Sequence, residues 1–342
     1  MTALAREGWG MPGLTGLHRW MGVLAVLLAA VPPARAQQPI DRPEPLAAAV
    51  KLVVGYNKVP HVSPLKLIDS RMKAMNVELQ MVEFLRYADT RTALASGSIE
   101  VGTVGPADVP IAVSQGITSI IGIMGVGVSP KNPIAHKGMK LDRWDDLKGK
   151  RVGIAPGSAV WFQFAATLQE VGVPYNQLQI VNIQGGGMPF VQSMQRGDLD
   201  VYAGWEPFES MTEMDGSGYR VAGLDYSKSK AVGDELGLIA ISKPTLEAKR
   251  EAVRRFLWAY LDAQREAMAS PDKLAETISA WTGLEPQVSR NVARVTKLGQ
   301  FLTMEQVKRQ AAAFFQFGVI TKDVSGELDK YFDQAILQTV TK

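Results

Sequence analysis

The chain has 342 residues, of which 46% are hydrophobic and 21% are charged, a composition that excludes a disordered chain and fits one large domain or two smaller ones. Its net charge of +3 comes from interspersed charges, so no clustered basic face predicts a nucleic-acid partner. The lack of cysteine excludes disulfides, a cysteine nucleophile and a lipid-modified N-terminal cysteine, and with three histidines in the whole chain we expect neither a metal site nor a cofactor.

The N-terminal 36 residues have the pattern of a secretory signal peptide. Arg19 precedes an apolar run at 21–31, and an Ala-Arg-Ala motif follows at 34–36. As a helix, that run would be about 16 Å long, which is short of the roughly 30 Å hydrocarbon layer of a membrane. We therefore predict a cleavable signal peptide at 1–36 and a periplasmic protein without a lipid anchor. A short membrane anchor is the alternative.

Strand-like and helix-like patterns alternate in the first third of the mature chain. Alternating or continuous apolar runs predict the strands, and Asp89 and Gly97 are the expected start and stop of one helix. The expected strands are 51–56, 76–84, 99–105 and 117–128, and the expected helices are 63–75, 90–95 and 106–115. This order is typical of a doubly wound α/β sheet.

The same alternation begins again near residue 151 and gives way to helices after residue 245. The expected strands are 151–154, 178–182, 200–203, 220–224 and 236–241, and the expected helices are 159–171 and 190–196. Two α/β modules followed by a helical tail predict two lobes with a cleft between them. No long linker separates the modules, so we expect two short crossovers between the lobes.

Several short segments resemble motifs of one family of periplasmic solute-binding proteins. They include the GYNK entry strand, the DLKGK segment that leads through a strand to Pro-Gly-Ser, and the WEPF element. In chain order the matching segments are 54–58, 94–102, 146–158, 204–208 and 251–284. The family resembled comprises the binding components of ABC importers for alkanesulfonates, taurine and nitrate, with relatives that bind pyrimidine precursors of thiamine.

This resemblance implies an α/β fold of the two-lobed type II periplasmic binding protein. Each lobe would have a doubly wound, mostly parallel sheet, and the helical C-terminal tail would pack on lobe 1. Lobe 1 would comprise 40–136 and 237–342, and lobe 2 would comprise 137–236. The implied function is capture of a small anionic solute by hinge closure and delivery to an ABC permease and ATPase complex. We expect a monomer, because one cleft and one docking face suffice.

The solute expected from the resemblance is of the sulfonate type. Alkanesulfonate, taurine, nitrate and an aromatic acid all remain open. The pyrimidine-binding relatives carry a cysteine-rich motif that this sequence lacks, which counts against a thiamine precursor.

Two strand-to-helix junctions are the expected anion sites. Ligands of open α/β sheets bind beyond the carboxyl ends of the strands, and a helix that begins there presents free N–H groups and a positive dipole end. The junction residues are Gly105, Pro106, Ala107, Gly157, Ser158 and Ala159. The alternative for Ser158 is a helix N-cap with no ligand contact.

Other polar and aromatic residues follow the remaining strand ends. Tyr56 would stack on the ligand or donate to it, Asn57 would act as a neutral donor and acceptor, and Arg86 would hold an oxyanion in a bidentate pair. The alternatives are a buried structural tyrosine and a solvated arginine. Gly185 and Gly186 lie in a glycine run that, like Asn57, departs from the family pattern.

Trp205 and Glu206 form the last expected pair. Trp205 would supply an apolar wall for an alkyl or aryl chain. Glu206 would suit an ammonium group, which makes a zwitterion such as taurine plausible if its side chain faces the pocket. The favoured alternative is that Glu206 caps the next turn or braces the hinge.

Two other functions remain open at the level of the sequence. An enzyme of the same fold would act in the same cleft, although the chain has no Gly-x-Ser-x-Gly, His-Glu-x-x-His or Ser-x-x-Lys motif. A sensory binding protein would report ligand occupancy to a membrane kinase on a separate chain. We expect the chain not to be an enzyme.

Overall fold

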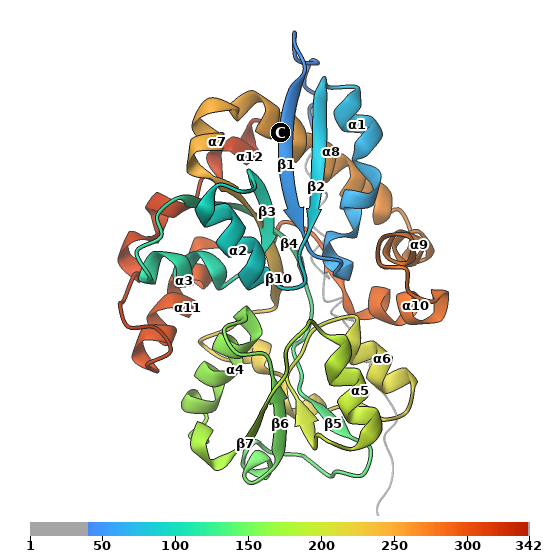
Figure 1. The fold of residues 1–342 in the computed structure, drawn as a ribbon, viewed down its shortest axis with the longest axis vertical. Helices are drawn as coiled ribbons and strands as arrows, with labels where there is room; N and C mark the ends of the chain where they lie inside the picture. The colour runs from blue at the N-terminus through green and yellow to red at the C-terminus, as the bar shows by residue number, and fades with distance from the viewer. Residues whose placement is uncertain (1–39, 341–342) are drawn as a thin grey trace, which may run out of the picture. The chain divides into compact units, whose positions relative to one another are not determined.

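The computed structural model describes residues 40–340, so the predicted signal peptide, 1–36, lies outside the described residues. Within the described part of the chain, no helix has the length and the apolar character needed to cross a membrane. Two β-sheets with flanking helices organise these residues (Figure 1). We call the six-stranded sheet with its helices lobe 1 and the five-stranded sheet with its helices lobe 2.

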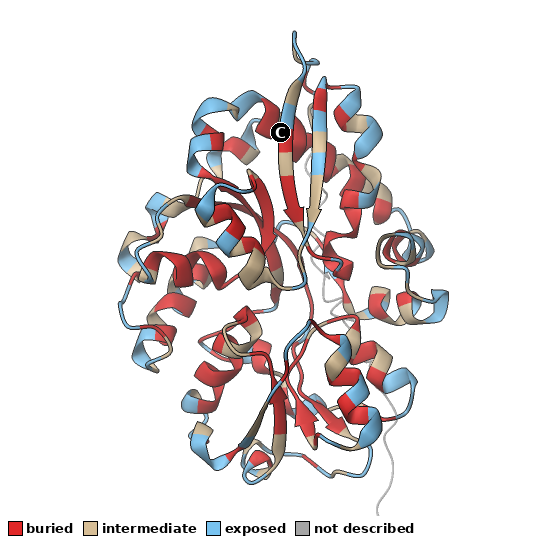
Figure 2. Ribbon diagram, viewed as in Figure 1, coloured by how far each residue is buried: buried red, intermediate tan, exposed pale blue. Residues whose placement is uncertain are grey.

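The sheet of lobe 1 is mixed. β1 pairs in parallel with β2 and β3, whereas β10 pairs antiparallel with β3 and β4. In sheet order the strands are β11 (Lys297–Leu298), β4 (Ile120–Val128), β10 (Glu235–Ser242), β3 (Val101–Val104), β1 (Val50–Tyr56) and β2 (Val77–Glu83). Every residue of β4 is buried, as expected for a strand covered on both faces (Figure 2).

The sheet of lobe 2 has the same mixed character. β6 pairs in parallel with β7 and β8, and β5 pairs antiparallel with β8 and β9. In sheet order the strands are β7 (Gln179–Asn182), β6 (Arg151–Ile154), β8 (Val201–Tyr202), β5 (Ile134–His136) and β9 (Gly218–Arg220). The expected two-lobed α/β fold is confirmed, and both sheets are mixed because β5 and β10, the strands that follow the crossovers, run antiparallel to their neighbours.

Two crossover segments connect the lobes. Residues 129–133 lead from β4 to β5, and residues 221–234 lead back from β9 to β10. The two segments run side by side, since the Tyr226 N–H donates to the Lys131 carbonyl (2.8 Å) and the Ser129 N–H donates to the Asp234 carbonyl (2.9 Å). The connection between the lobes is therefore a hydrogen-bonded pair of segments.

Helices cover both sheets. In lobe 1 the first helices are α1 (Asp69–Lys73), α2 (Tyr87–Ser96) and α3 (Asp108–Ser114), and in lobe 2 they are α4 (Ala159–Glu170), α5 (Met188–Arg196) and α6 (Phe208–Met214). The C-terminal region adds α7 (Lys243–Ala248), α8 (Arg250–Ala267), α9 (Pro271–Thr282), α10 (Pro286–Val295), α11 (Met304–Gln316) and α12 (Ala335–Gln338).

The C-terminal helices contact both lobes, although we expected them to pack on lobe 1. α8 does pack against α1 of lobe 1, but α10 contacts α6 and α11 contacts α4, and both of these partners belong to lobe 2. The rings of Phe314 on α11 and Phe162 on α4 lie 5.9 Å apart within one shared core cluster. Burial of these apolar faces holds the tail against lobe 2 as well.

Three local predictions are wrong in detail. The helix expected at 63–75 is a 3₁₀ helix at Pro60–Leu67 followed by the short α1, because Pro64 cannot supply an N–H to a continuous α-helix. Asp89 is not an N-cap, since α2 begins two residues earlier and Asp89 pairs with Arg86. The strand expected at 220–224 is β9 at Gly218–Arg220 followed by a 3₁₀ turn.

Candidate functional site

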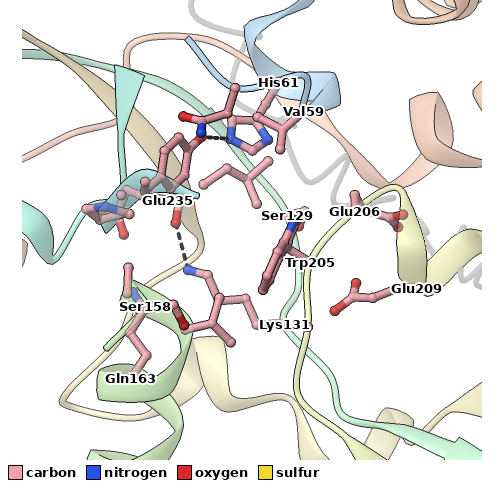
Figure 3. Close-up of a pocket in the computed structure, with 18 of the residues that line it drawn as sticks. Val59, His61, Ser129, Lys131, Ser158, Gln163, Trp205, Glu206, Glu209 and Glu235 are labelled. Carbon is pink, nitrogen blue, oxygen red and sulfur yellow. Dashed lines mark hydrogen bonds between the residues drawn. The ribbon is translucent and has the colours of Figure 1, made fainter. Parts of the chain in front are cut away.

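A pocket lies among the strand ends of both lobes and the two crossover segments. Its empty volume is about 740 Å³, part of which is open to solvent. Side chains from lobe 1, from α4 and from the loop after β8 line it (Figure 3). Ligands of open α/β sheets bind at this position, beyond the carboxyl ends of the strands.

Eight of the expected site residues line this pocket, and five do not. The lining includes Asn57, Arg86, Gly105, Pro106, Ser158, Ala159, Trp205 and Glu206. The others are Tyr56, Ala107, Gly157, Gly185 and Gly186. The pocket lining thus includes most of the strand ends named from the sequence, although five of the named residues lie outside it.

Tyr56 and Ala107 face other parts of lobe 1. The Tyr56 ring lies 4.8 Å from the ring of Trp281, and its hydroxyl donates to Glu83 (3.3 Å). Alternation along a strand explains this placement, because successive side chains point to opposite faces. Ala107 is fully buried in the core cluster that the two lobes share.

The three glycines contribute backbone conformation. Gly157, Gly185 and Gly186 have φ angles of +77°, +82° and +90°, a region that L-residues with side chains rarely adopt. Gly157 turns the chain from β6 into α4, and the other two turn it from β7 toward α5. Their role in the structure is to shape these two loops beside the pocket.

The first turn of α4 presents free donors to the pocket. The Ser158 hydroxyl accepts from the Trp161 N–H (3.1 Å), which makes Ser158 the N-cap, and the Ser158 carbonyl accepts from the Phe162 N–H (3.2 Å). Ala159 and Val160 also line the pocket, and no hydrogen bond of residues 40–340 uses their N–H groups. The positive end of the helix dipole adds to these two amides.

Gln163 lies one turn further along α4 and also lines the pocket (Figure 3). The residue is 2% exposed, and its Nε2 atom has no hydrogen-bond partner. An unpaired buried amide is costly, so the Gln163 amide is a donor that a solute in the pocket can satisfy. Tyr226, at 1% exposure, adds a second unpartnered group through its hydroxyl.

The junction at the start of α3 differs, because the chain supplies its own anion there. Asp108 is buried, and its Oδ2 atom accepts from the Gly105 N–H (2.6 Å), while Oδ1 pairs with Arg91. Burial raises the pKa of Asp108, and the Arg91 guanidinium acts in the opposite direction. The expected anion site at Gly105, Pro106 and Ala107 is thus occupied by a neighbouring carboxylate.

Asn57 and Arg86 are largely committed to other residues. The Asn57 amide donates to the Phe84 carbonyl (2.9 Å), and its oxygen accepts from Thr90 (3.2 Å) and Thr103 (3.3 Å). Arg86 donates through Nε and Nη2 to Asp89 (3.2 and 2.9 Å) and through Nη1 to Gln184 of lobe 2 (3.4 Å). Arg86 therefore connects the lobes at the pocket rim.

The WEPF segment forms the wall opposite α4. The Trp205 ring packs edge-on against Phe190 and Phe208, with centroids 5.7 and 6.0 Å away. Glu206 accepts from the Ser210 N–H (3.2 Å) and hydroxyl (3.0 Å) and pairs with Arg220. The alternative favoured from the sequence, that Glu206 caps the following turn, agrees with these bonds.

Glu209 is a second carboxylate in the same wall. One of its oxygens accepts from Arg220 (2.7 Å), and Figure 3 shows the carboxylate turned toward the Lys131 side of the pocket. Burial raises the pKa of Glu209 to about 7, against the opposing influence of Arg220. Glu209 is therefore a buried carboxyl group that Arg220 holds at the pocket wall.

Lys131, Gln163, Glu209 and Tyr226 were not expected from the sequence. Gln163 and Glu209 lie inside helices, Tyr226 lies within the second crossover, and Lys131 lies beyond the residues that directly follow β4. The sequence offered one signal for two of them. Gln163 follows Ser158–Ala159 by one helical turn, and Glu209 follows Trp205–Glu206 by one turn. Residues one turn apart lie on the same face of a helix.

The two lobes touch at the pocket. A Cβ built on Gly105 of lobe 1 would stand 2.6 Å from the Cβ of Ala159 of lobe 2, so the two junctions are in direct contact. Together with the Arg86–Gln184 bond, this contact joins the two lobes at the pocket.

Comparisons with known proteins agree with this architecture. A family model described as NMT1/THI5 like matches residues 73–274. The taurine-binding periplasmic protein of Escherichia coli (strain K12) is 26% identical over 268 residues, which cover 76% of this chain and 81% of that protein.

Solved structures with low sequence identity share the fold. The alkanesulfonate-binding protein SsuA from Xanthomonas axonopodis pv. citri bound to MOPS has a TM-score of 0.68 at 21% identity, covering 81% of this chain and 96% of that one. The desulfurization enzyme DSZB has a TM-score of 0.58 at 13% identity, covering 84% and 97%. Because the fold carries both binding proteins and an enzyme, function has to be argued from the pocket.

Proposed function

Because the chain belongs to the NMT1/THI5-like family, we propose that it is the periplasmic solute-binding component of an ABC importer and captures a small organic sulfonate between its lobes. The named relatives bind taurine and an alkanesulfonate, which supports this solute class. A permease and an ATPase would receive the solute from the closed form, and the protein would act as a monomer.

The observation that carries this proposal is the set of unpartnered donors on one side of the pocket. The Ala159 and Val160 amides, the Gln163 amide and the Tyr226 hydroxyl all belong to the lining, and each lacks an acceptor among the described residues. A sulfonate has three acceptor oxygens and one negative charge, so it can satisfy several of these donors at the positive end of α4.

Charge on the opposite wall favours an organic sulfonate over nitrate. The lining contains the carboxylates of Glu206, Glu209 and Glu235, and its cations are Lys131 and Arg86, the latter paired with Asp89. Arg220 offsets part of the charge of Glu206 and Glu209, but an inorganic anion would still lie close to these carboxylates. A solute with an apolar or cationic portion beside Trp205 and Glu209 would avoid that repulsion, and taurine combines both charges.

A thermal-shift panel on the mature chain from Gln37 tests the proposal. The panel contains taurine, ethanesulfonate, an aryl sulfonate, nitrate and an aromatic carboxylate, with ethylamine as the control that lacks a sulfonate. At 100 times its Kd, a ligand adds about 2.7 kcal/mol, which raises Tm by several degrees. We expect such a shift with at least one sulfonate and none with ethylamine.

Two results would contradict the proposal. One is the absence of any shift with every sulfonate in a sample that mass spectrometry shows to be free of co-purified ligand. The other is conversion of the bound sulfonate, since recovery of a desulfonated product would make the protein an enzyme. A bound solute that is recovered unchanged agrees with a binding protein.

A further inference from the structure

Lys131 occupies an unusual position at the hinge. It lies in the first crossover segment, and its side chain lines the pocket with the residue only 8% exposed. Its ammonium group donates to the carbonyls of Gly233 and of Glu235 (2.7 Å), which belong to the second crossover segment and the start of β10 (Figure 3). One side chain therefore links both crossovers and reaches the pocket.

The ammonium group has one donor left. An ammonium carries three N–H bonds, and the two backbone carbonyls use two of them. A buried cation whose hydrogen bonds are incompletely satisfied is stabilised by any acceptor that enters the pocket, most strongly by an anion. The Arg86 guanidinium, by contrast, already has Asp89 as its partner.

Several titratable groups face Lys131 from the neighbouring elements. Glu235 lies at the start of β10, Asp225 and Asp234 lie in the second crossover, and Glu209 lies on α6. His61 stays neutral, because burial lowers its pKa to about 3. Burial lowers the pKa of Lys131 to about 8 in spite of the carboxylates, and burial raises the pKa of Glu235.

We infer that Lys131 recognises the anionic group of the solute and couples solute binding to the hinge. One N–H of its ammonium group would donate to the solute, while the other two donate to the carbonyls of Gly233 and Glu235. This inference rests on the proposed function, since it assumes an anionic solute. The side chain holds the two crossovers at the spacing of the closed form, and a bound anion keeps it charged and in place.

The first test measures the affinity of the wild-type protein for ethanesulfonate by calorimetry from pH 6 to pH 9.5. Above about pH 8 the free protein loses the Lys131 proton, so affinity should fall by up to tenfold per pH unit. Binding at pH 8.5 should take up protons, which calorimetry in two buffers of different ionisation enthalpy detects. Burial raises the pKa of Glu209 to about 7 and also raises that of Glu235, so the profile of Lys131→Arg, described next, serves to separate their titration from that of Lys131.

Variants test whether Lys131 causes the loss of affinity at alkaline pH. Lys131→Arg keeps a charge that does not titrate in this range, so it should bind ethanesulfonate at pH 7 within about threefold of wild type but without the fall above pH 8. Lys131→Met should lose at least tenfold in affinity at pH 7. Lys140→Met, which removes an exposed lysine, should behave like wild type.

The outcomes separate this inference from the proposed function. If the wild-type protein binds no sulfonate at any pH, the proposed function fails. If it binds, but Lys131→Arg retains the same alkaline fall and proton uptake, then Lys131 does not contact the anion and the inference alone is overturned. The arginine variant keeps the test valid if Lys131→Met does not fold.

Discussion

The start of α3 in lobe 1 and the start of α4 in lobe 2 have the same local backbone arrangement, but the amides of only one of them are paired with a carboxylate of the chain. Both follow a buried parallel strand, and both have a glycine at the turn and line the same pocket. At α3, Asp108 accepts the Gly105 N–H and pairs with Arg91. At α4, a neutral Ser158 caps the helix, and the amides beyond it have no partner.

The difference shows what turns a helix N-terminus into a binding site. A dipole end attracts any nearby anion, including one from the chain itself, and a carboxylate within the first turn satisfies it. Asp108 stabilises lobe 1 in this way. Ser158 leaves the amides at the start of α4 available to a solute. An anion can therefore bind at the α4 side of the pocket, whereas Asp108 already neutralises the α3 side.

Asp108→Asn should have the largest effect, and it acts on stability. The substitution leaves the Arg91 guanidinium without its buried partner, which costs about 3–5 kcal/mol by analogy with other broken buried pairs. Urea unfolding would measure the loss. Asp272→Asn, in the exposed first turn of α9, is the control and should cost less than about 1 kcal/mol. Equal effects would mean that Asp108 does not neutralise the α3 junction.

Ser158→Asp would make the α4 junction resemble the α3 junction. Aspartate is as good an N-cap as serine, so stability should change little, but its carboxylate would occupy the anion position. We expect at least a 100-fold loss of ethanesulfonate affinity by calorimetry, or about 2.7 kcal/mol. Ser270→Asp places the same change at the N-cap of α9 and should leave affinity unchanged. Unchanged affinity in Ser158→Asp would place the solute elsewhere.

The sequence predicted the two junctions but could not distinguish them. Glycine after an apolar strand and the helical pattern beyond it are visible in both. Whether the Asp108 carboxylate turns back to the Gly105 amide or faces solvent depends on Arg91, whose position beside it is set by the packing of α2 on α3. The sequence likewise gave no indication that Glu206 would be bound to Arg220, a residue of β9.

Most strands and helices of regular length were predicted, whereas two of the very short strands were missed. β5 has three residues and β11 has two, which is too short for an alternating pattern to be recognised. Both pair with neighbours that are far away in sequence, β5 with β8 and β11 with β4. Lys131 was missed for a related reason. Its place between the two crossovers depends on their pairing in the folded chain, and the crossovers are far apart in the sequence.

Gly105→Ala tests the contact between the junctions. The new methyl group would stand 2.6 Å from the Ala159 Cβ and 3.0 Å from an Asp108 oxygen, so the closed form would be destabilised. We expect about a tenfold loss of affinity and a larger radius of gyration with ligand in small-angle scattering. Adding Ala159→Gly should restore most of the affinity, and Gly326→Ala, at a position with open space, should have no effect. If Ala159→Gly does not restore the affinity, the contact between Gly105 and Ala159 does not control closure of the lobes.

Gln163→Leu should give the smallest effect, and it should change stability and affinity in opposite directions. Removing an unpartnered buried amide should leave the ligand-free protein as stable or more stable, while ethanesulfonate affinity falls by about two- to tenfold. Gln264→Leu is the contrast, because its amide donates to the Val126 carbonyl (3.3 Å) away from the pocket. That variant should lose stability and keep its affinity. The reverse pattern would mean that Gln163 does not contact the solute.

The most direct test of the contrast between the junctions is a crystal structure of the mature protein with 2-bromoethanesulfonate, whose bromine is located by anomalous scattering. We predict sulfonate oxygens within hydrogen-bond distance of the Ala159 and Val160 amides, with the bromine toward Trp205. A sulfonate bound at the Gly105 amide in place of the Asp108 carboxylate, or outside the pocket, would contradict the account.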